Sequence, residues 1–406
     1  MSKQNQSYVG PLIIIGLLFF VFGFVTWVNG TLITFFKKAF SLDNTSSYLV
    51  TFAFFISYTV MAIPSSEVLK RTGFKRGMSL GLVIMAVGTL IFIPAAQIAS
   101  YPLFLVGLFT IGIGLTLLQT ASNPYATILG PRESAAQRIS FMGIANKMAG
   151  IFSQRLFGGL LLAGGAAATP QEELQKVELP YMILTGILVV LAGVIWFSKG
   201  LPDVSEEQED TEGKAIKVQH NSVFSFPNLV LGVIALFCYV GVEVISGDTI
   251  INYGVSLGFS EAEASTFGTY TLWSMLAAYV LGIVLIPKYV SQNLCLQVSA
   301  ILGIVGTVLA VTTGGFTSVL SIAFLGFANA LVWPAMWPLA LDGLGKFTKT
   351  GSALLIMGIS GGAILPLVYG NIADSIHSTQ QAYWMMMPLY LFILYYAFIG
   401  YKKRSW

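Results

Sequence analysis

Long runs of apolar residues recur along the whole chain, and they restrict its possible folds more than any other feature. Two examples are GPLIIIGLLFFVFGFVTWVNGTLITFF at 10–36 and GMSLGLVIMAVGTLIFIPAAQI at 77–98. A helix needs about 20 apolar residues to cross a bilayer, and twelve stretches of this sequence qualify. Only 10% of the residues are charged, against about 25% in soluble domains. The sequence therefore predicts an all-α, multi-pass membrane protein with twelve transmembrane helices in contact with lipid.

The remaining residues argue against several other classes of protein. Cys238 and Cys295 fall inside predicted helices, which leaves no disulfide framework and no zinc cluster. The sequence shows no nucleophilic residue paired with a general base, so we expect neither an enzyme nor a cofactor. The net charge of +3 gives no reason to expect nucleic acid as a partner. The first apolar run lacks the cationic start and the cleavage site of a signal peptide, so we expect it to be retained.

The basic residues between the predicted helices are unevenly distributed. If the N-terminus is cytoplasmic, sixteen Lys and Arg residues fall in cytoplasmic segments and three, Lys37, Lys38 and Lys176, fall in outer loops. Cytoplasmic loops of membrane proteins are enriched in Lys and Arg. We therefore predict that both termini are cytoplasmic, and we expect a monomer.

The chain divides into two similar halves. The longest polar stretch, 201–221, separates residues 1–200 from residues 222–406, and it is acidic at first and then mixed in charge. Aligning the two halves places Gly30 opposite Asp248. Parallel six-helix repeats related by an axis normal to the membrane are typical of major facilitator transporters. We therefore predict two six-helix halves joined by a cytoplasmic linker.

Polar side chains within the predicted helices are candidates for a substrate site, because burying such groups in hydrocarbon is costly. Amides hydrogen-bond to sugar hydroxyls, and indole rings cover the apolar faces of a sugar. Each amide can instead join two helices, and each tryptophan can instead anchor a helix at the membrane surface. The candidate substrate-binding residues are Asn29, Gln119, Asn123, Asn146, Asn252, Asn329, Trp333 and Trp337.

Lys147 stands near the middle of a predicted helix. It follows Arg138 by nine residues, which is about 13 Å of helix, and half of the hydrocarbon core is about 15 Å. The first half offers no carboxylate at that depth, whereas the seventh helix carries Glu243 and Asp248. We predict that Lys147 faces the other half and pairs with Glu243, as part of a coupling or gating device. A static structural pair is the alternative.

Three motifs carry a family resemblance. GLTLLQTASNPYATILGP at 114–131, FLVGLFTIGIG at 104–114 and IPAAQIASYPLFLVGL at 93–108 resemble the fucose–galactose–glucose permease family of the major facilitator superfamily. A further motif, RISFMGIANKMAG at 138–150, is more similar to bacterial glucose/galactose and N-acetylglucosamine permeases than to the fucose/proton symporter. The resemblance implies the major facilitator fold, a bacterial inner membrane, and cation-coupled hexose uptake by alternating access.

Two positions depart from the family pattern. The resemblance implies carboxylates that handle protons where this chain has Gly30 and Gln119, and neither of these residues titrates. Asn146, in contrast, matches a polar position on the substrate side of the family's site. The family's proton route therefore does not transfer to this chain, and the remaining candidates are Glu243 and Asp248.

The predicted function is symport of a hexose, such as glucose, galactose or N-acetylglucosamine, with Na⁺ or H⁺. A sodium ion would take oxygen ligands near Glu243, Ser246, Asp248 and Thr249, where Gly247 permits a break in the helix. A passive sugar uniporter is one alternative. A drug/proton antiporter is another, disfavoured because the site is rich in amides. The sequence leaves the hexose and the ion open.

Overall fold

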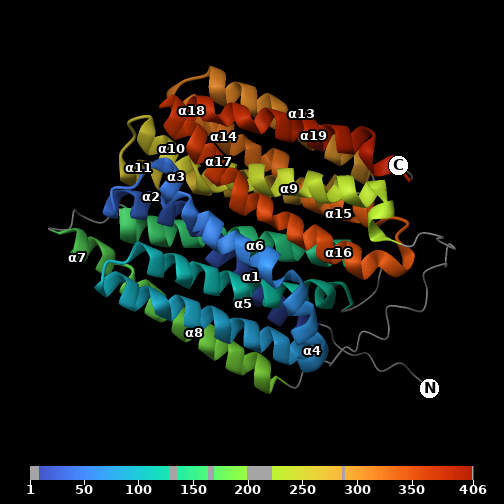
Figure 1. Ribbon diagram of the computed structural model, residues 1–406, viewed down its shortest axis with the longest axis horizontal. Coiled ribbons are helices and arrows are strands. Elements are labelled where there is room, and N and C mark those ends of the chain that lie inside the picture. Colours follow the sequence, from blue (N-terminus) through green and yellow to red (C-terminus); the bar gives the residue numbers. More distant parts are fainter. Residues whose placement is uncertain (1–8, 129–134, 163–168, 199–221, 286–288, 405) are drawn as a thin grey trace.

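The protein is helical throughout the part that its structure describes (Figure 1). The computed structural model describes residues 9–128, 135–162, 169–198, 222–285, 289–404 and 406. The predicted linker at 201–221 lies outside these residues. The exact boundaries of the two halves, at 200 and 222, therefore stay a prediction.

The twelve predicted spans are present in the described part of the chain. Ten stretches there are long and apolar enough to cross a membrane, by length and composition. One of them, α4, is two helices joined at Gly73, whose φ of 74° favours glycine. A further span is α6 (Ala135–Phe157), which continues through a π-helical turn at Gly158–Leu162. Polar residues such as Lys147 make α6 less apolar than the other spans, although it is equally long.

The first half is drawn in blue to green in Figure 1 and the second half in yellow to red. Besides α6, the first half contains α1 (Val9–Trp27), α2 (Asn29–Ala39), α3 (Asn44–Ser47), α4 (Leu49–Gln97), α5 (Tyr101–Ile128), α7 (Pro170–Gln175) and α8 (Glu178–Phe197). The second half contains α9 (Pro227–Asp248), α10 (Ile250–Ser256), α11 (Glu261–Ala264), α12 (Phe267–Leu285), α13 (Gln292–Thr312), α14 (Gly315–Ala330), α15 (Val332–Leu341), α16 (Thr348–Met357), α17 (Gly361–Ile376), α18 (Thr379–Ala382) and α19 (Met386–Phe398).

The halves meet where α6 packs against α12, α17 against α4, and α2 against α9 and α10. Small residues allow the close approach of helices here and within each half. For example, a Cβ at Gly23 of α1 would lie 1.8 Å from the carbonyl oxygen of Asn146 on α6. The outer faces are apolar, as on α8, where the side chains of Val190 and Phe197 are exposed. Such faces suit contact with lipid.

Several of the spans that approach the interface are interrupted near their middle. The break between α1 and α2 is at Val28, that between α9 and α10 is at Thr249, and that between α14 and α15 is at Leu331. A 3₁₀ turn at Gly358–Ser360 separates α16 from α17. The break predicted near Gly247 is therefore present two residues further along. The breaks at Val28 and Thr249 occupy nearly equivalent places in the two halves.

The two ends of the molecule are different. Short helices α3, α7, α11 and α18 lie at one end, which we call the α3 end (Figure 1). The other end holds the start of α1 and the end of α19, and we call it the terminal end. Most of the groups described next lie where the two halves meet.

Candidate functional site

A buried ion pair joins the two halves near their middle. Lys147 Nζ on α6 lies 3.3 Å from Glu243 Oε1 on α9, and the two side chains are 7% and 15% exposed. The pairing predicted for Lys147 is therefore present. Its role in coupling or gating stays a prediction.

Trp27 forms one wall of this site. The Lys147 ammonium lies 4.1 Å from the centre of the Trp27 ring, and Trp27 Nε1 donates to Asn146 Oδ1 at 3.2 Å. The ring packs against Gly150 of its own half and Gly247 of the other half, where added Cβ atoms would come within 2.6 and 2.5 Å. Trp27 thus links the ion pair to Asn146 and to the contact between the halves.

Asp248 lies directly opposite Gly30. A Cβ at Gly30 would lie 3.0 Å from the Cα of Asp248 and 3.1 Å from its carbonyl oxygen. Asp248 is 2% exposed, and its Oδ1 has no hydrogen-bond partner among the described residues. The two positions that correspond in the internal repeat are therefore in contact with each other.

Two further amides are buried at this level without partners. Asn29 and Gln154 are both fully buried, and neither the nitrogen nor the oxygen of either amide has a hydrogen-bond partner in the described part of the chain. Gln154 packs against Gly268 of α12 in the other half. Gln154 was not among the residues predicted from the sequence. It lies seven residues after Lys147 on the same face of α6, and this spacing could have identified it as a candidate.

Gln119 and Trp333 face each other across the halves. They line a small gap together with Tyr58, Thr116, Thr120, Ile356 and Ile359, and its volume is about 20 Å³. Trp337 stacks on Trp333 with ring centres 5.0 Å apart. A gap of this size holds about one water molecule and no sugar. The halves are therefore closed around this point, and the side chain of Asn123 lies outside the described residues.

Three predicted residues have partners inside the second half. Asn329 is fully buried, donates to Ser246 Oγ at 3.2 Å and accepts from the Tyr390 hydroxyl at 2.9 Å. Thr249 Oγ1 shares a hydrogen bond of 2.7 Å with the Tyr383 hydroxyl. These contacts fit the alternative role stated for the amides, in which a buried polar side chain joins two helices. The hydroxyls of Ser246 and Thr249 are occupied within this half, whereas Glu243 and Asp248 contact the first half.

A group of polar contacts closes the α3 end. The Asp374 carboxylate on α17 accepts hydrogen bonds from the backbone N–H and the side chain of both Asn44 and Thr45, at 2.7–3.2 Å. Asn252, whose role in sugar binding stays a prediction, also lies here: its Nδ2 donates to Asn44 Oδ1 at 3.1 Å, and its Oδ1 accepts from Lys37 Nζ at 3.1 Å. We call these five residues the clasp.

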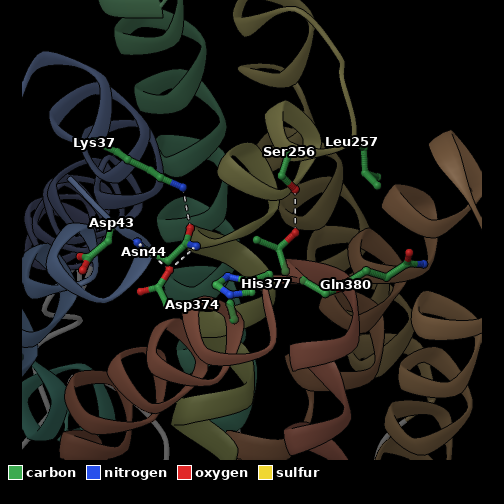
Figure 2. A pocket seen from close by; sticks show the side chains of 11 residues that line it. Lys37, Asp43, Asn44, Ser256, Leu257, Asp374, His377 and Gln380 are labelled. Carbon is green, nitrogen blue, oxygen red and sulfur yellow. Dashed lines mark hydrogen bonds between the residues drawn. The ribbon is translucent and has the colours of Figure 1, made fainter. Parts of the chain in front are cut away.

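Figure 2 shows the cavity beside the clasp. Its volume is about 570 Å³, and both halves contribute to its lining. Asp374 and Asn44 point toward each other at its wall, and His377 lies beside Asp374 (Figure 2). His377 ends α17, in the loop position predicted for it. His220 lies outside the described residues.

The comparisons with known proteins agree on one family. The family model described as Major Facilitator Superfamily matches residues 15–366. A glucose/galactose transporter of Brucella abortus is 35% identical, over 99% of this chain and 97% of that protein. A putative glucose/galactose transporter of Helicobacter pylori is 31% identical, over 96% of each. The L-fucose-proton symporter of Escherichia coli is 27% identical, over 100% of this chain and 95% of that protein.

Solved structures show the same fold. The E. coli fucose:proton symporter in its outward conformation gives a TM-score of 0.72 at 26% identity, with 96% of this chain and 98% of that chain covered. A bacterial homologue of the lysosomal transporter Spinster, in an inward-facing conformation, gives 0.71 at 16% identity, with 100% and 99% covered. At that identity the second likeness concerns the fold alone.

Proposed function

Since the chain belongs to the major facilitator superfamily, and within it to the fucose–galactose–glucose permease family, we propose that it carries a hexose such as glucose or galactose across a bacterial inner membrane together with a proton. The observation that carries this proposal is the similarity of nearly the full chain to two proteins named as glucose/galactose transporters. A third relative is named as a proton symporter. N-acetylglucosamine is the other sugar that the sequence motifs favour.

We propose that the sugar binds between the halves, with Gln119 and Asn146 as hydrogen-bonding groups and Trp333 and Trp337 as an apolar wall. Two observations support this. Gln119 and Trp333 already face each other from opposite halves, and the Asn146 amide lies beside Trp27 at the interface. Asn123 follows Gln119 by one helical turn on α5. Asn29 and Gln154 have amides free to bind sugar hydroxyls or water when the halves part.

The test of the site is sugar binding by variants of purified protein. Gln119→Ala and Asn146→Ala should each weaken binding by more than about 1 kcal/mol, which is roughly a fivefold rise in Kd, because each removes a hydrogen bond at a buried site. Calorimetry with glucose, galactose, mannose, fucose and N-acetylglucosamine measures this and identifies the substrate. Gln292→Ala, at an exposed position, is the control. Unchanged binding in both variants would refute the site.

Proton coupling is tested with proteoliposomes. An inward pH gradient should drive accumulation of the sugar, and replacing Na⁺ by K⁺ should change nothing. Accumulation that depends on Na⁺ would instead favour a sodium site at the carboxylates of α9. Equilibration without accumulation under either gradient would favour the passive uniporter, with Lys147–Glu243 as a structural latch. Efflux of lipophilic cations would favour the drug/proton antiporter.

We propose that both termini and residues 201–221 are cytoplasmic, and that the protein is a monomer. The uneven distribution of Lys and Arg supports this orientation. It would place the α3 end outside, so the described conformation is closed toward the outside. A protease site inserted at residue 210 should be cut in inside-out vesicles and not in right-side-out ones. Cutting in the right-side-out vesicles would reverse the orientation.

A further inference from the structure

The two carboxylates of α9 that approach the first half have different surroundings. The Glu243 carboxylate accepts a hydrogen bond from Lys147 Nζ at 3.3 Å. Asp248 forms no ion pair within the described residues, and its Oδ1 is buried without a hydrogen-bond partner. Their side chains therefore differ in how well a negative charge is compensated.

The groups that face Asp248 come from each half. Lys147 on α6 and Glu243 on α9 are the charged groups within electrostatic range, the titratable Tyr48 lies just before α4, and Gly30 on α2 lies against the Asp248 backbone. The Lys147 ammonium is already paired with Glu243. A buried carboxylate without its own counterion is strongly unfavourable, and protonation removes the charge.

We propose that Asp248 is the proton-carrying residue, and that it is protonated while the halves are closed at the α3 end. Glu243 serves as the ion-pair partner of Lys147. The inference rests on the proposed sugar/proton symport. It assigns the proton to Asp248 and the ion pair with Lys147 to Glu243.

The contact with Gly30 explains how a proton would be linked to the movement of the halves. Gly30 of the other half lies against the backbone of Asp248, and the Asp248 side chain is buried where the halves meet. When the halves part at the α3 end, water reaches the carboxyl group and it exchanges its proton with that side. Closure over bound sugar then requires a neutral Asp248.

The first experiment observes the proton directly. Infrared spectroscopy of the purified protein should show the C=O band of a protonated carboxyl group at neutral pH. Asp248→Asn should abolish that band, whereas the control Glu263→Gln, at an exposed position, should keep it. If Asp248→Asn leaves the band unchanged, Asp248 is ionised and the proposal is wrong. This result does not depend on the identity of the sugar.

The second experiment measures coupling. With a pH gradient of about one unit, a sugar carried with one proton accumulates by up to about tenfold. In the Asp248→Asn variant, the internal sugar concentration should reach only about the external concentration. The ratio of accumulation to counterflow should therefore fall by about tenfold. Accumulation equal to that of the parent would overturn the assignment. Failure of the parent itself to transport any hexose would instead refute the proposed function, and the infrared test would still stand.

Discussion

At the level of single residues, Lys147 depends on contacts from both halves. Its ammonium lies 3.3 Å from Glu243 and 4.1 Å from the centre of the Trp27 ring. A cation over a desolvated indole gains about 2 kcal/mol, and a buried ion pair is tolerated only when both partners are present. Removing one partner is therefore more harmful than removing both.

We predict that Lys147→Ala and Glu243→Gln are strongly coupled. Loss of Lys147 should destabilise the protein by about 3–5 kcal/mol, because it leaves a buried carboxylate alone. The double variant should recover a large part of this loss. Denaturation in detergent and sugar counterflow, measured for both single variants and the double variant, give the interaction energy. Additive effects would mean that the pair contributes little to either property.

At the level of helices, the approach of α1 to α6 depends on a missing side chain. Gly23 lies so close to the backbone of Asn146 that an added Cβ would stand 1.8 Å from its carbonyl oxygen. On α8, in contrast, nothing lies within 4 Å of a Cβ at Gly193. The two glycines look alike in sequence, since each lies in a long apolar helix.

We predict opposite effects of alanine at these two positions. Gly23→Ala should force α1 away from α6 and destabilise the protein by about 1–3 kcal/mol, as overpacking does. Gly193→Ala should be neutral or stabilising by up to about 1 kcal/mol, because alanine favours a helix over glycine. Thermal unfolding in detergent compares the two. A Gly23→Ala protein as stable as its parent would show that α1 and α6 can separate freely.

The spans could be predicted from the sequence because apolar length alone identifies them. The partner of Lys147 could be predicted from depth and charge, since one helix offered carboxylates at its level. The position of Asn252 in the clasp could not, because it depends on how far one half is shifted along the other. The bonding of Asn329 could not either, because it depends on how α14 packs against α9 and α19 within the second half.

At the level of the whole molecule, the clasp holds the halves together at the α3 end. Asp374 accepts four hydrogen bonds from Asn44 and Thr45. Lys38 and Glu261 also pair across the halves at 2.8 Å, but their side chains are 49% and 30% exposed. Exposed pairs of this kind contribute about 0–1 kcal/mol. The clasp should therefore govern closure and the exposed pair should not.

We predict that Asp374→Ala shifts the population toward a state open at the α3 end. Hydrogen bonds to a charged group contribute about 1.5–3 kcal/mol, enough for a shift of about tenfold or more. Spin labels at the exposed positions Gln97 and Thr312 should report a longer distance by pulsed electron resonance. Lys38→Ala is the matched control and should leave the distances unchanged. Equal distributions in both variants would show that closure does not need Asp374.

The position of Trp27 between the halves makes it a native optical probe. It is one of seven tryptophans, and its ring is covered by Gly150 on one side of the interface and Gly247 on the other. Four others, Trp196, Trp273, Trp384 and Trp406, have exposed side chains. Parting of the halves removes Gly247 from the ring and admits water, so Trp27 emission should shift to longer wavelength. Each transport cycle is thus expected to be visible as a rise and fall of fluorescence, with no label added.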